Sequence, residues 1–184
     1  MIKKRNLIIL LVIVGVSAST IPLILYNISV QNPNPWEVRI FGSGVNGTIT
    51  ISYDDLISGE YLQVENRVFD ILNRLNYTYS YTYTGVSVWD VLQKSGILYP
   101  NATKFRFSSE DNYICDWLPL NISSSNPEKV ILAYIEDGKF LETKIMGGYG
   151  PMRSVVDITL VQQFNPPTYN SQFWVKYTNG IEVS

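Results

Sequence analysis

The stretch from Thr84 to Leu92 constrains the fold of this chain more than any other segment. An extended segment ends at Thr84, Gly85 predicts a turn, and Ser87 is a good first residue for capping a helix. Gly96 is the expected stop of that helix. Its apolar side would be formed by Val88, Val91 and Leu92. The pattern therefore predicts a strand that leads directly into a short amphipathic helix.

Four tyrosines precede this point and alternate with serine and threonine: Tyr77, Tyr79, Tyr81 and Tyr83. A period of two places all four rings on one face of a strand. One interpretation is a stacking platform for a sugar or another flat ligand. The interpretation that we favour is a half-buried strand with its rings packed on the core, because any such strand shows this alternation.

Other short apolar segments predict further strands and turns. Expected strands cover residues 36–41, 48–52, 104–107, 130–135, 139–141, 159–164 and 173–177. Asp137-Gly138 predicts a hairpin turn, and Gly147 to Gly150 a turn that needs positive φ. Ser52 followed by Asp55 predicts a helix start rather than a catalytic carboxylate pair. Because short strands dominate and helices are few, we expect a strand-rich α+β domain.

The beginning of the chain has the pattern of a membrane segment. Residues 1–6 are a basic flank, and residues 7–26 are free of charge and long enough to cross a bilayer. The alternative is a cleaved signal peptide with a site at residues 17–19. Residues 27–35 predict an extended linker, so the domain covers 36–184 and lies outside the cytoplasm on either interpretation.

Charge and cysteine content exclude several classes of protein. Three of the 14 basic residues lie in the first six residues and no acidic residue precedes Glu37, which leaves 11 basic against 16 acidic residues and a net charge of −5. This acidic domain lacks a basic run, so we expect no nucleic-acid partner. A single cysteine, Cys115, excludes an intrachain disulfide. Five Asn-x-Ser/Thr sites predict a glycosylated surface: Asn27, Asn46, Asn76, Asn101 and Asn121.

An ordered set of blocks resembles the sulfite-oxidase-type, oxidoreductase molybdopterin-binding domain. The blocks are Trp36 to Gly42, Tyr53 to Leu56, Tyr83 to Leu92, Phe105 to Tyr113, Leu132 to Tyr134, Gly138 to Leu141, Gly147 to Val156, Phe173 to Tyr177 and Ile181 to Val183. In the block from Phe105, Asn112 replaces the family glycine, and Asp157 follows Val156 where the family has proline. The resemblance covers nearly all of 36–184. It implies a strand-rich α+β, sulfite-oxidase-type fold, which residues 7–26 would precede as one N-terminal transmembrane helix.

The same resemblance indicates which residues would serve a cofactor. Family members bind molybdenum through a cysteine thiolate, whose position would fall within residues 71–81, and this stretch contains no cysteine. Cys115 lies after Gly85, and we interpret it as a small buried residue. The chain has no histidine, so the family's cofactor-binding histidines have no counterpart. Arg153, Lys176 and Ser109 match pocket positions of the family and would be the remnant of an anion-binding pocket.

These observations lead to a functional expectation. We expect a single-pass protein of the cell membrane whose outer domain is a non-catalytic binding or interaction module. Its other partners would be a small anion or a protein. We expect no catalytic residue, no metal ligand and no cofactor, with molybdopterin implied by the resemblance alone. The alternative is a molybdopterin-dependent, sulfite-oxidase-like oxidoreductase with atypical metal ligation.

Overall fold

The computed structural model describes residues 34–164 and 169–184, and Asn34–Ser184 form one compact unit. The expected basic flank, membrane segment and most of the linker lie outside the described residues, as does Asn27. Within the described stretches, no helix is both long and apolar enough to cross a membrane.

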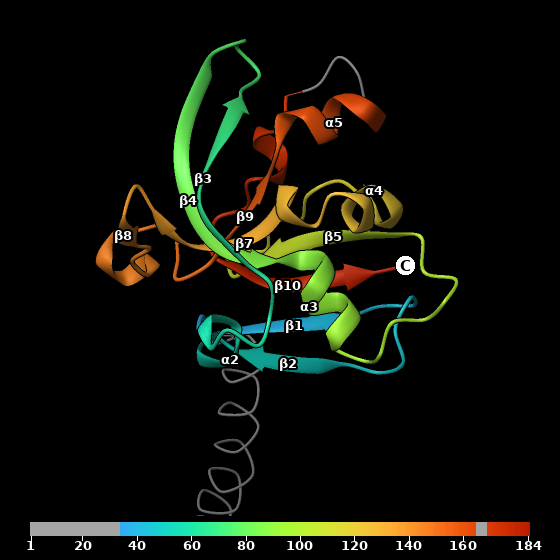
Figure 1. Ribbon diagram of the computed structural model, residues 1–184. Coiled ribbons are helices and arrows are strands. Elements are labelled where there is room, and N and C mark those ends of the chain that lie inside the picture. Colours follow the sequence, from blue (N-terminus) through green and yellow to red (C-terminus); the bar gives the residue numbers. More distant parts are fainter. Residues whose placement is uncertain (1–33, 165–168) are drawn as a thin grey trace, which may run out of the picture. The chain divides into compact units, whose positions relative to one another are not determined.

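The first sheet contains five strands in the order β2-β1-β10-β5-β6 (Figure 1). These are β1 (Glu37–Phe41), β2 (Ile49–Ser52), β5 (Lys104–Ser109), β6 (Leu118–Pro119) and β10 (Thr178–Val183). The first and last strands of the domain, β1 and β10, pair in parallel, and the other pairs are antiparallel. The two ends of the described chain are therefore joined at the centre of one sheet.

The second sheet is antiparallel and is built around β7. Its strands are β3 (Gln63–Leu72), β4 (Thr78–Ser87), β7 (Val130–Glu136), β8 (Lys139–Phe140) and β9 (Arg153–Val156). One edge of β7 pairs with β4, and the other edge pairs with β9 along its first half and with β8 along its second. Figure 1 shows the long β3–β4 hairpin extending away from the first sheet.

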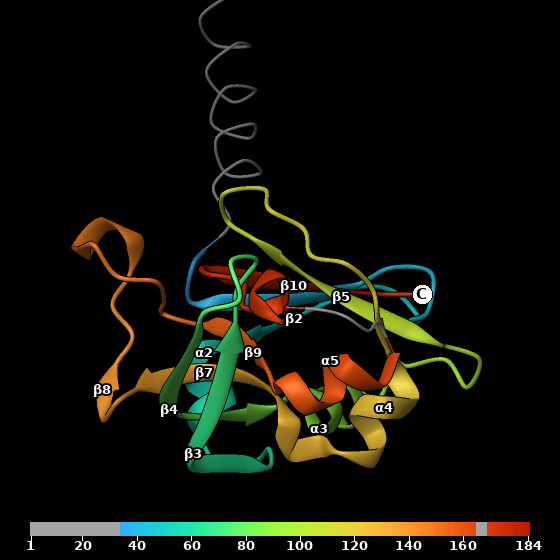
Figure 2. The ribbon, with the colours of Figure 1, turned by 90° about the horizontal axis from the view of Figure 1, so that it is seen from above.

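Four short helices connect and cover the sheets: α2 (Tyr53–Ile57), α3 (Val88–Lys94), α4 (Leu120–Ser125) and α5 (Ile158–Phe164). Figure 2 shows α3, α4 and the second sheet on the same side of the first sheet. The main core lies between the first sheet and the layer formed by these helices and the second sheet. It combines Val38 and Ile40 of β1, Phe105 and Phe107 of β5, and Leu92 of α3, all fully buried. A smaller cluster on the other face of the second sheet contains Phe69, Tyr83 and Trp174.

Both predicted helix starts are confirmed by their caps. The Oγ of Ser52 accepts a hydrogen bond from the backbone N of Asp55 at 3.1 Å, so the acidic pair here begins a helix. The Oγ of Ser87 accepts from the backbone N of Asp90 at 3.3 Å and begins α3. Gly96 follows α3 with φ of +70°, as expected for a helix stop.

Two predicted strands are wrong. Residues 159–164 belong to helix α5, because the Asp157 carboxylate accepts from the backbone N of Thr159 at 2.8 Å and begins a helical turn. Phe173 is the last residue of a 3₁₀ helix, Ser171–Phe173, and the strand begins later than expected, at Thr178. The segment between them is nevertheless bound to β9, since Ser154 and Val175 exchange hydrogen bonds.

The predicted turn at Gly85 is also wrong, because β4 runs through this residue without interruption. Thr84 pairs with Ile135 and Gly85 pairs with Ala133, so β7 contains one additional residue, Tyr134, at this point. A Cβ atom on Gly85 would lie 2.4 Å from the carbonyl oxygen of Leu132. Glycine is required here by the close approach of two strands rather than by a turn.

The strand that carries the four tyrosines is buried progressively along its length. Tyr83 is fully buried, Tyr81 is half-buried, and Tyr79 and Tyr77 are 50% and 59% exposed. The inner two rings pack on the smaller cluster, in agreement with the interpretation we favoured. The outer two lie near the tip of the β3–β4 hairpin, which projects beyond the core.

Substituting Gly85 tests the close approach of β4 and β7. Gly85→Ala should lower the free energy of unfolding by about 1–3 kcal/mol, because the new methyl group forces the two strands apart. The control, Thr78→Ala at the exposed outer end of β4, should change it by less than about 0.5 kcal/mol. Urea unfolding gives both values, and equal effects of the two substitutions would contradict the steric explanation.

Candidate functional site

Among the three site residues expected from the sequence, Arg153 has the most polar and aromatic partners. It is the first residue of β9 and is 7% exposed. Its Nη1 donates to the hydroxyl of Tyr83 at 3.1 Å and to Oε2 of Glu136 at 3.0 Å. The Tyr83 hydroxyl also donates to Oε2 of Glu136. Three side chains from three strands thus form one buried hydrogen-bonded cluster.

The additional residue in β7 brings Glu136 into this cluster. Arg153 pairs with Ala133, so both lie on the same face of the sheet. In a regular strand, Glu136 would point to the opposite face from Ala133, because successive side chains alternate. The bulge at Tyr134 shifts the alternation by one residue, and Glu136 becomes the register partner of Tyr83.

Aromatic rings enclose the guanidinium of Arg153. Its Cζ lies 5.5 Å from the ring centroid of Trp174 and 5.7 Å from those of Tyr83 and Tyr149. Trp174 is fixed in turn by a hydrogen bond from its Nε1 to the carbonyl of Val156, at 2.9 Å. Each ring face attracts the cation and displaces water from it. The enclosure therefore holds Arg153 in a defined orientation.

Tyr83 remains a neutral donor inside this cluster. Burial is the largest influence and raises the pKa of Tyr83 well above its usual value. The charge of Arg153 lowers the pKa, while the hydrogen bond to Glu136 raises it further. The cluster at neutral pH is therefore a cation, an anion and an uncharged phenol that bridges them.

One polar atom of the cluster has no partner among the described residues. The Nε of Arg153 is buried and makes no hydrogen bond there. A buried donor without a partner costs about 1–3 kcal/mol. This atom is the feature of the site that an additional acceptor, such as an anion, would satisfy.

The structure brings Lys176 close to Arg153 but places Ser109 in a different network. The Nζ of Lys176 lies 3.8 Å from the ring centroid of Tyr149, the ring that also borders Arg153. Lys176 is exposed, so Tyr149 separates a surface cation from a buried one. The Oγ of Ser109 donates to the carboxylate of Asp111 and accepts from the backbone N of Tyr113 at 3.1 Å. Ser109 thus organises its own loop.

Four members of the Arg153 environment were not predicted as site residues: Tyr83, Glu136, Tyr149 and Trp174. Tyr83 was expected only as one ring of an alternating strand. Glu136 precedes a hairpin turn, where an acidic residue is unremarkable by itself. Their meeting depends on a bulge and on strand pairs that are distant in sequence, such as Tyr83 with Glu136. No local periodicity in the sequence predicts that these residues meet.

Cys115 is buried, as expected, and is 3% exposed. Its Sγ accepts from the backbone N of Phe107 at 3.2 Å and its thiol donates to the carbonyl of Asp116 at 3.3 Å. Burial raises the pKa of the Cys115 thiol to about 12. It therefore remains a protonated thiol in the main core and is unsuited to binding a metal.

The fold does not supply the ligands that a molybdenum cofactor needs. Residues 71–81, where the thiolate is expected, form the tip of the β3–β4 hairpin and contain no cysteine. The described residues contain no group of three or more His, Cys, Asp or Glu side chains that could hold a metal ion. Arg153 is largely neutralised by Glu136. The residues present do not fit the cofactor.

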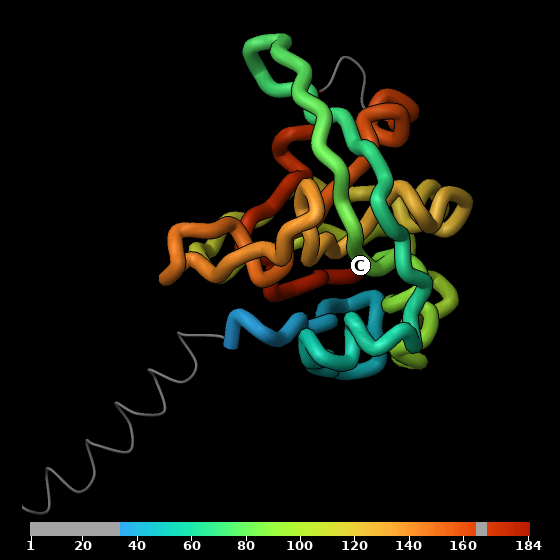
Figure 3. Tube along the Cα trace, turned by 60° about the vertical axis from the view of Figure 1, so that its left-hand side comes forward, coloured from blue at the N-terminus to red at the C-terminus, as the bar shows by residue number. Residues whose placement is uncertain are grey.

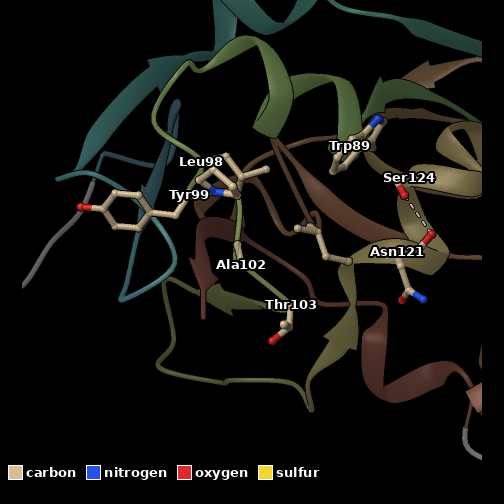
Figure 4. Close-up of a pocket in the computed structure, with 9 residues that line it drawn as sticks. Trp89, Leu98, Tyr99, Ala102, Thr103, Asn121 and Ser124 are labelled. Carbon is tan, nitrogen blue, oxygen red and sulfur yellow. Dashed lines mark hydrogen bonds between the residues drawn. The ribbon is translucent and has the colours of Figure 1, made fainter.

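A separate cavity of about 570 Å³ lies between α3 and α4 (Figure 4). Its walls come from Trp89 of α3, from the loop of residues 98–103, and from Leu120, Asn121 and Ser124 of α4. This lining includes no charged side chain. The hydroxyl of Ser124 is already bound to the carbonyl of Asn121 at 2.9 Å. The cavity has a size typical of ligand pockets but lacks a group that would bind an anion.

Comparisons with known proteins support the fold. No protein-family model matches the chain, and a search of curated proteins gives no significant match. Among solved structures, the chain is similar to the sulfane dehydrogenase SoxCD from Paracoccus pantotrophus, with a TM-score of 0.56 and 15% sequence identity. The match covers 82% of this chain but only 39% of the SoxCD chain. The described domain therefore has a strand-rich α+β fold that resembles the sulfite-oxidase-type domain of SoxCD.

Removing Glu136 tests the energetic role of the cluster. Glu136→Ala should lower the free energy of unfolding by about 3 kcal/mol, because it leaves the Arg153 charge buried without its counter-ion. The control Glu65→Ala, at an exposed position of β3, should change it by less than about 0.5 kcal/mol. Adding Arg153→Met to Glu136→Ala should recover part of the loss. Denaturant unfolding of the four proteins checks this, and a double variant less stable than Glu136→Ala would contradict it.

The pKa of Tyr83 predicts a loss of stability at alkaline pH. Because its folded pKa is raised, the contribution of this phenol is fully present below about pH 10, the unfolded value, and is lost as the pH rises above it. Tyr83→Phe should therefore make the free energy of unfolding less dependent on pH between about pH 9 and 11. The control is Tyr79→Phe, at an exposed ring of the same strand. An unchanged pH dependence in Tyr83→Phe would contradict the assignment.

Proposed function

We propose that this protein is a membrane-anchored, non-catalytic binding or interaction module with a sulfite-oxidase-type domain outside the cytoplasm. The proposal rests on the burial and contacts of Arg153, the residue that matches a pocket position of the family. It is buried, paired with Glu136 and enclosed by three rings. A residue kept for a charged cofactor would instead present its donors to an open cavity.

The chemistry of the remaining residues supports a non-catalytic role. Histidine is absent from the chain, which removes the most common general acid and base. The single thiol is buried with a pKa of about 12 and is not a nucleophile at neutral pH. The fold is thus retained without the reactive groups through which such a domain would act on a substrate.

A second function is favoured by one observation. The Nε of Arg153, which has no partner among the described residues, is a buried donor that an anion could satisfy, and Lys176 and Arg153 both lie beside the Tyr149 ring. Displacement of the Tyr149 ring would open a route from the surface to Arg153. This arrangement suits a small oxyanion, since a guanidinium binds two oxygens at once. Anion binding would then be the binding activity of the module.

Membrane attachment is part of the proposal and is supported by the sequence. Residues 7–26 carry no charge and follow a basic flank, which favours an anchor with the domain on the outer side. The net charge of −5 beyond the flank suits a solvated outer domain.

Metal and pterin content distinguish the module from the oxidoreductase alternative. Protein produced in a host that makes the molybdenum cofactor should contain neither stoichiometric molybdenum nor releasable fluorescent pterin. Elemental analysis and pterin fluorescence after denaturation measure both. Stoichiometric molybdenum would overturn the proposal and establish atypical ligation. Calorimetric titration with sulfate and phosphate tests the anion function, and Arg153→Lys, which keeps the charge but loses the fork, should weaken any binding.

A further inference from the structure

The β8 hairpin and the following 3₁₀ helix form an apolar projection, which we call the apolar loop (Lys139–Met146). Ile145 is 98% exposed, Met146 68% and Phe140 64%. Phe140 stacks on Tyr134 with one face, whereas Ile145 and Met146 project from the loop and leave most of their apolar surface exposed. Exposed apolar groups of this kind indicate a surface that contacts a membrane or another molecule.

Lysines surround the base of the apolar loop. The Nζ of Lys144 lies 5.2 Å from the ring centroid of Tyr177, and that of Lys176 lies 3.8 Å from the ring centroid of Tyr149. The backbone N of Tyr177 donates to the carbonyl of Tyr149 at 2.9 Å, so the two cation–ring pairs are neighbours. Glu142 is the exposed acidic residue of the loop. The arrangement combines an apolar tip with cations set behind it.

A row of aromatic rings connects the apolar loop with the start of the domain. Ring centroids are 5.1 Å apart for Trp36 and Tyr53, 6.2 Å for Tyr53 and Tyr134, and 6.4 Å for Tyr134 and Phe140. Figures 1 and 3 show the beginning of β1 and the β8 hairpin at the same end of the domain. Trp36 itself is 45% exposed. Tryptophan and tyrosine favour the boundary between lipid and water.

The length of the linker limits how far this end of the domain can lie from the membrane. If residues 7–26 are the anchor, nine residues separate it from Trp36. Nine extended residues span at most about 30 Å. Trp36, at one end of the aromatic row, would therefore lie within about 30 Å of the bilayer from which the anchor emerges.

The described glycosylation sites lie on other elements. Asn46, Asn76, Asn101 and Asn121 are all exposed, as expected of acceptor sites. They belong to the β1–β2 loop, the tip of the β3–β4 hairpin, the loop before β5, and α4. Figure 1 shows α4 and the C-terminus away from β8. Glycans on these sites would leave the end that carries the apolar loop uncovered.

We propose that the apolar loop docks on the outer surface of the lipid bilayer that holds the anchor. Ile145 and Met146 enter the boundary between headgroups and acyl chains, Lys144 and Lys176 contact anionic headgroups, and Trp36 lies at the interface. An exposed apolar tip with lysines beside it fits a lipid surface, because apolar side chains enter the interfacial region while cations contact anionic headgroups. This inference rests on the proposed anchor, and it gives the domain a fixed orientation on the membrane.

A single label on the apolar loop can test the docking. The full chain is reconstituted into phosphatidylcholine–phosphatidylglycerol vesicles with Ile145→Cys carrying an environment-sensitive fluorophore. Native Cys115 is 3% exposed and does not compete for the label. The matched control is Leu75→Cys, at a 75% exposed apolar position on the distant hairpin tip. The label at 145 should emit at shorter wavelength and be quenched by nitroxide lipids, while the label at 75 should behave as in water.

Charge removal separates docking from non-specific adsorption. Lys144→Gln should lower the ratio of docked to undocked label about five-fold on anionic vesicles and leave it unchanged on pure phosphatidylcholine. Equal emission and equal absence of quenching at positions 145 and 75 would overturn the proposal. A shifted but unquenched label at 145 would also overturn it, and would identify a protein contact between copies of the chain.

Alkaline extraction of the same vesicles reports the anchor independently. If the chain stays in the lipid pellet while its label at position 145 remains in water, the anchor is supported and docking is refuted. If the chain is extracted although its label was quenched before extraction, the anchor is refuted and docking is supported. Recovery of a shortened chain that begins near Thr20 would show that residues 7–26 act as a signal peptide.

Discussion

The close contact of β4 with β7 at Gly85 determines how the second sheet is organised. The absence of a side chain at Gly85 lets the backbone approach Leu132 and Ala133, and one residue of β7 bulges out beside it. That bulge reverses which residues of β7 face the smaller cluster. Glu136 meets Tyr83 and Arg153 as a result, and Tyr134 joins the aromatic row on the other side. A buried ion pair and an exposed aromatic surface both follow from one irregularity in strand pairing.

The sequence predicted the parts of the fold whose signals are local. Ser52 and Ser87 identify their helices because a cap is a contact between residues three apart. The β7–β8 hairpin is likewise visible from Asp137-Gly138. By contrast, β3 contains a register shift between Val64 and Arg67 that disrupts its alternation, so periodicity gives no signal for it. Helix α5 was taken for a strand because its short apolar run fits either period.

The candidate site was predicted only in part, for a physical reason. Arg153 and Lys176 were identified through family resemblance, and the structure places both beside Tyr149. Their chemical state was not predictable, because the partner of Arg153 comes from a strand that the bulge reorients. Whether an arginine is free to bind a ligand depends on its counter-ion. In this domain the charge of Arg153 is largely compensated by Glu136.

The outer edge of β3 has a consequence for how copies of this protein can associate. β3 is the outermost strand of its sheet, and such an edge can pair with the same edge of a neighbouring copy. Asn66, with φ of +48°, interrupts the row of backbone donors and acceptors, and Arg67 and Asp70 place opposite charges along it. The Asn170 side chain also occupies part of this edge, because it accepts from the backbone N of Leu72 and donates to the carbonyl of Asp70, each at 2.7 Å. Two copies brought side by side therefore meet a kinked and charged edge instead of a straight template. Strand addition between copies, which needs a straight row of unpaired backbone groups, is disfavoured at this edge.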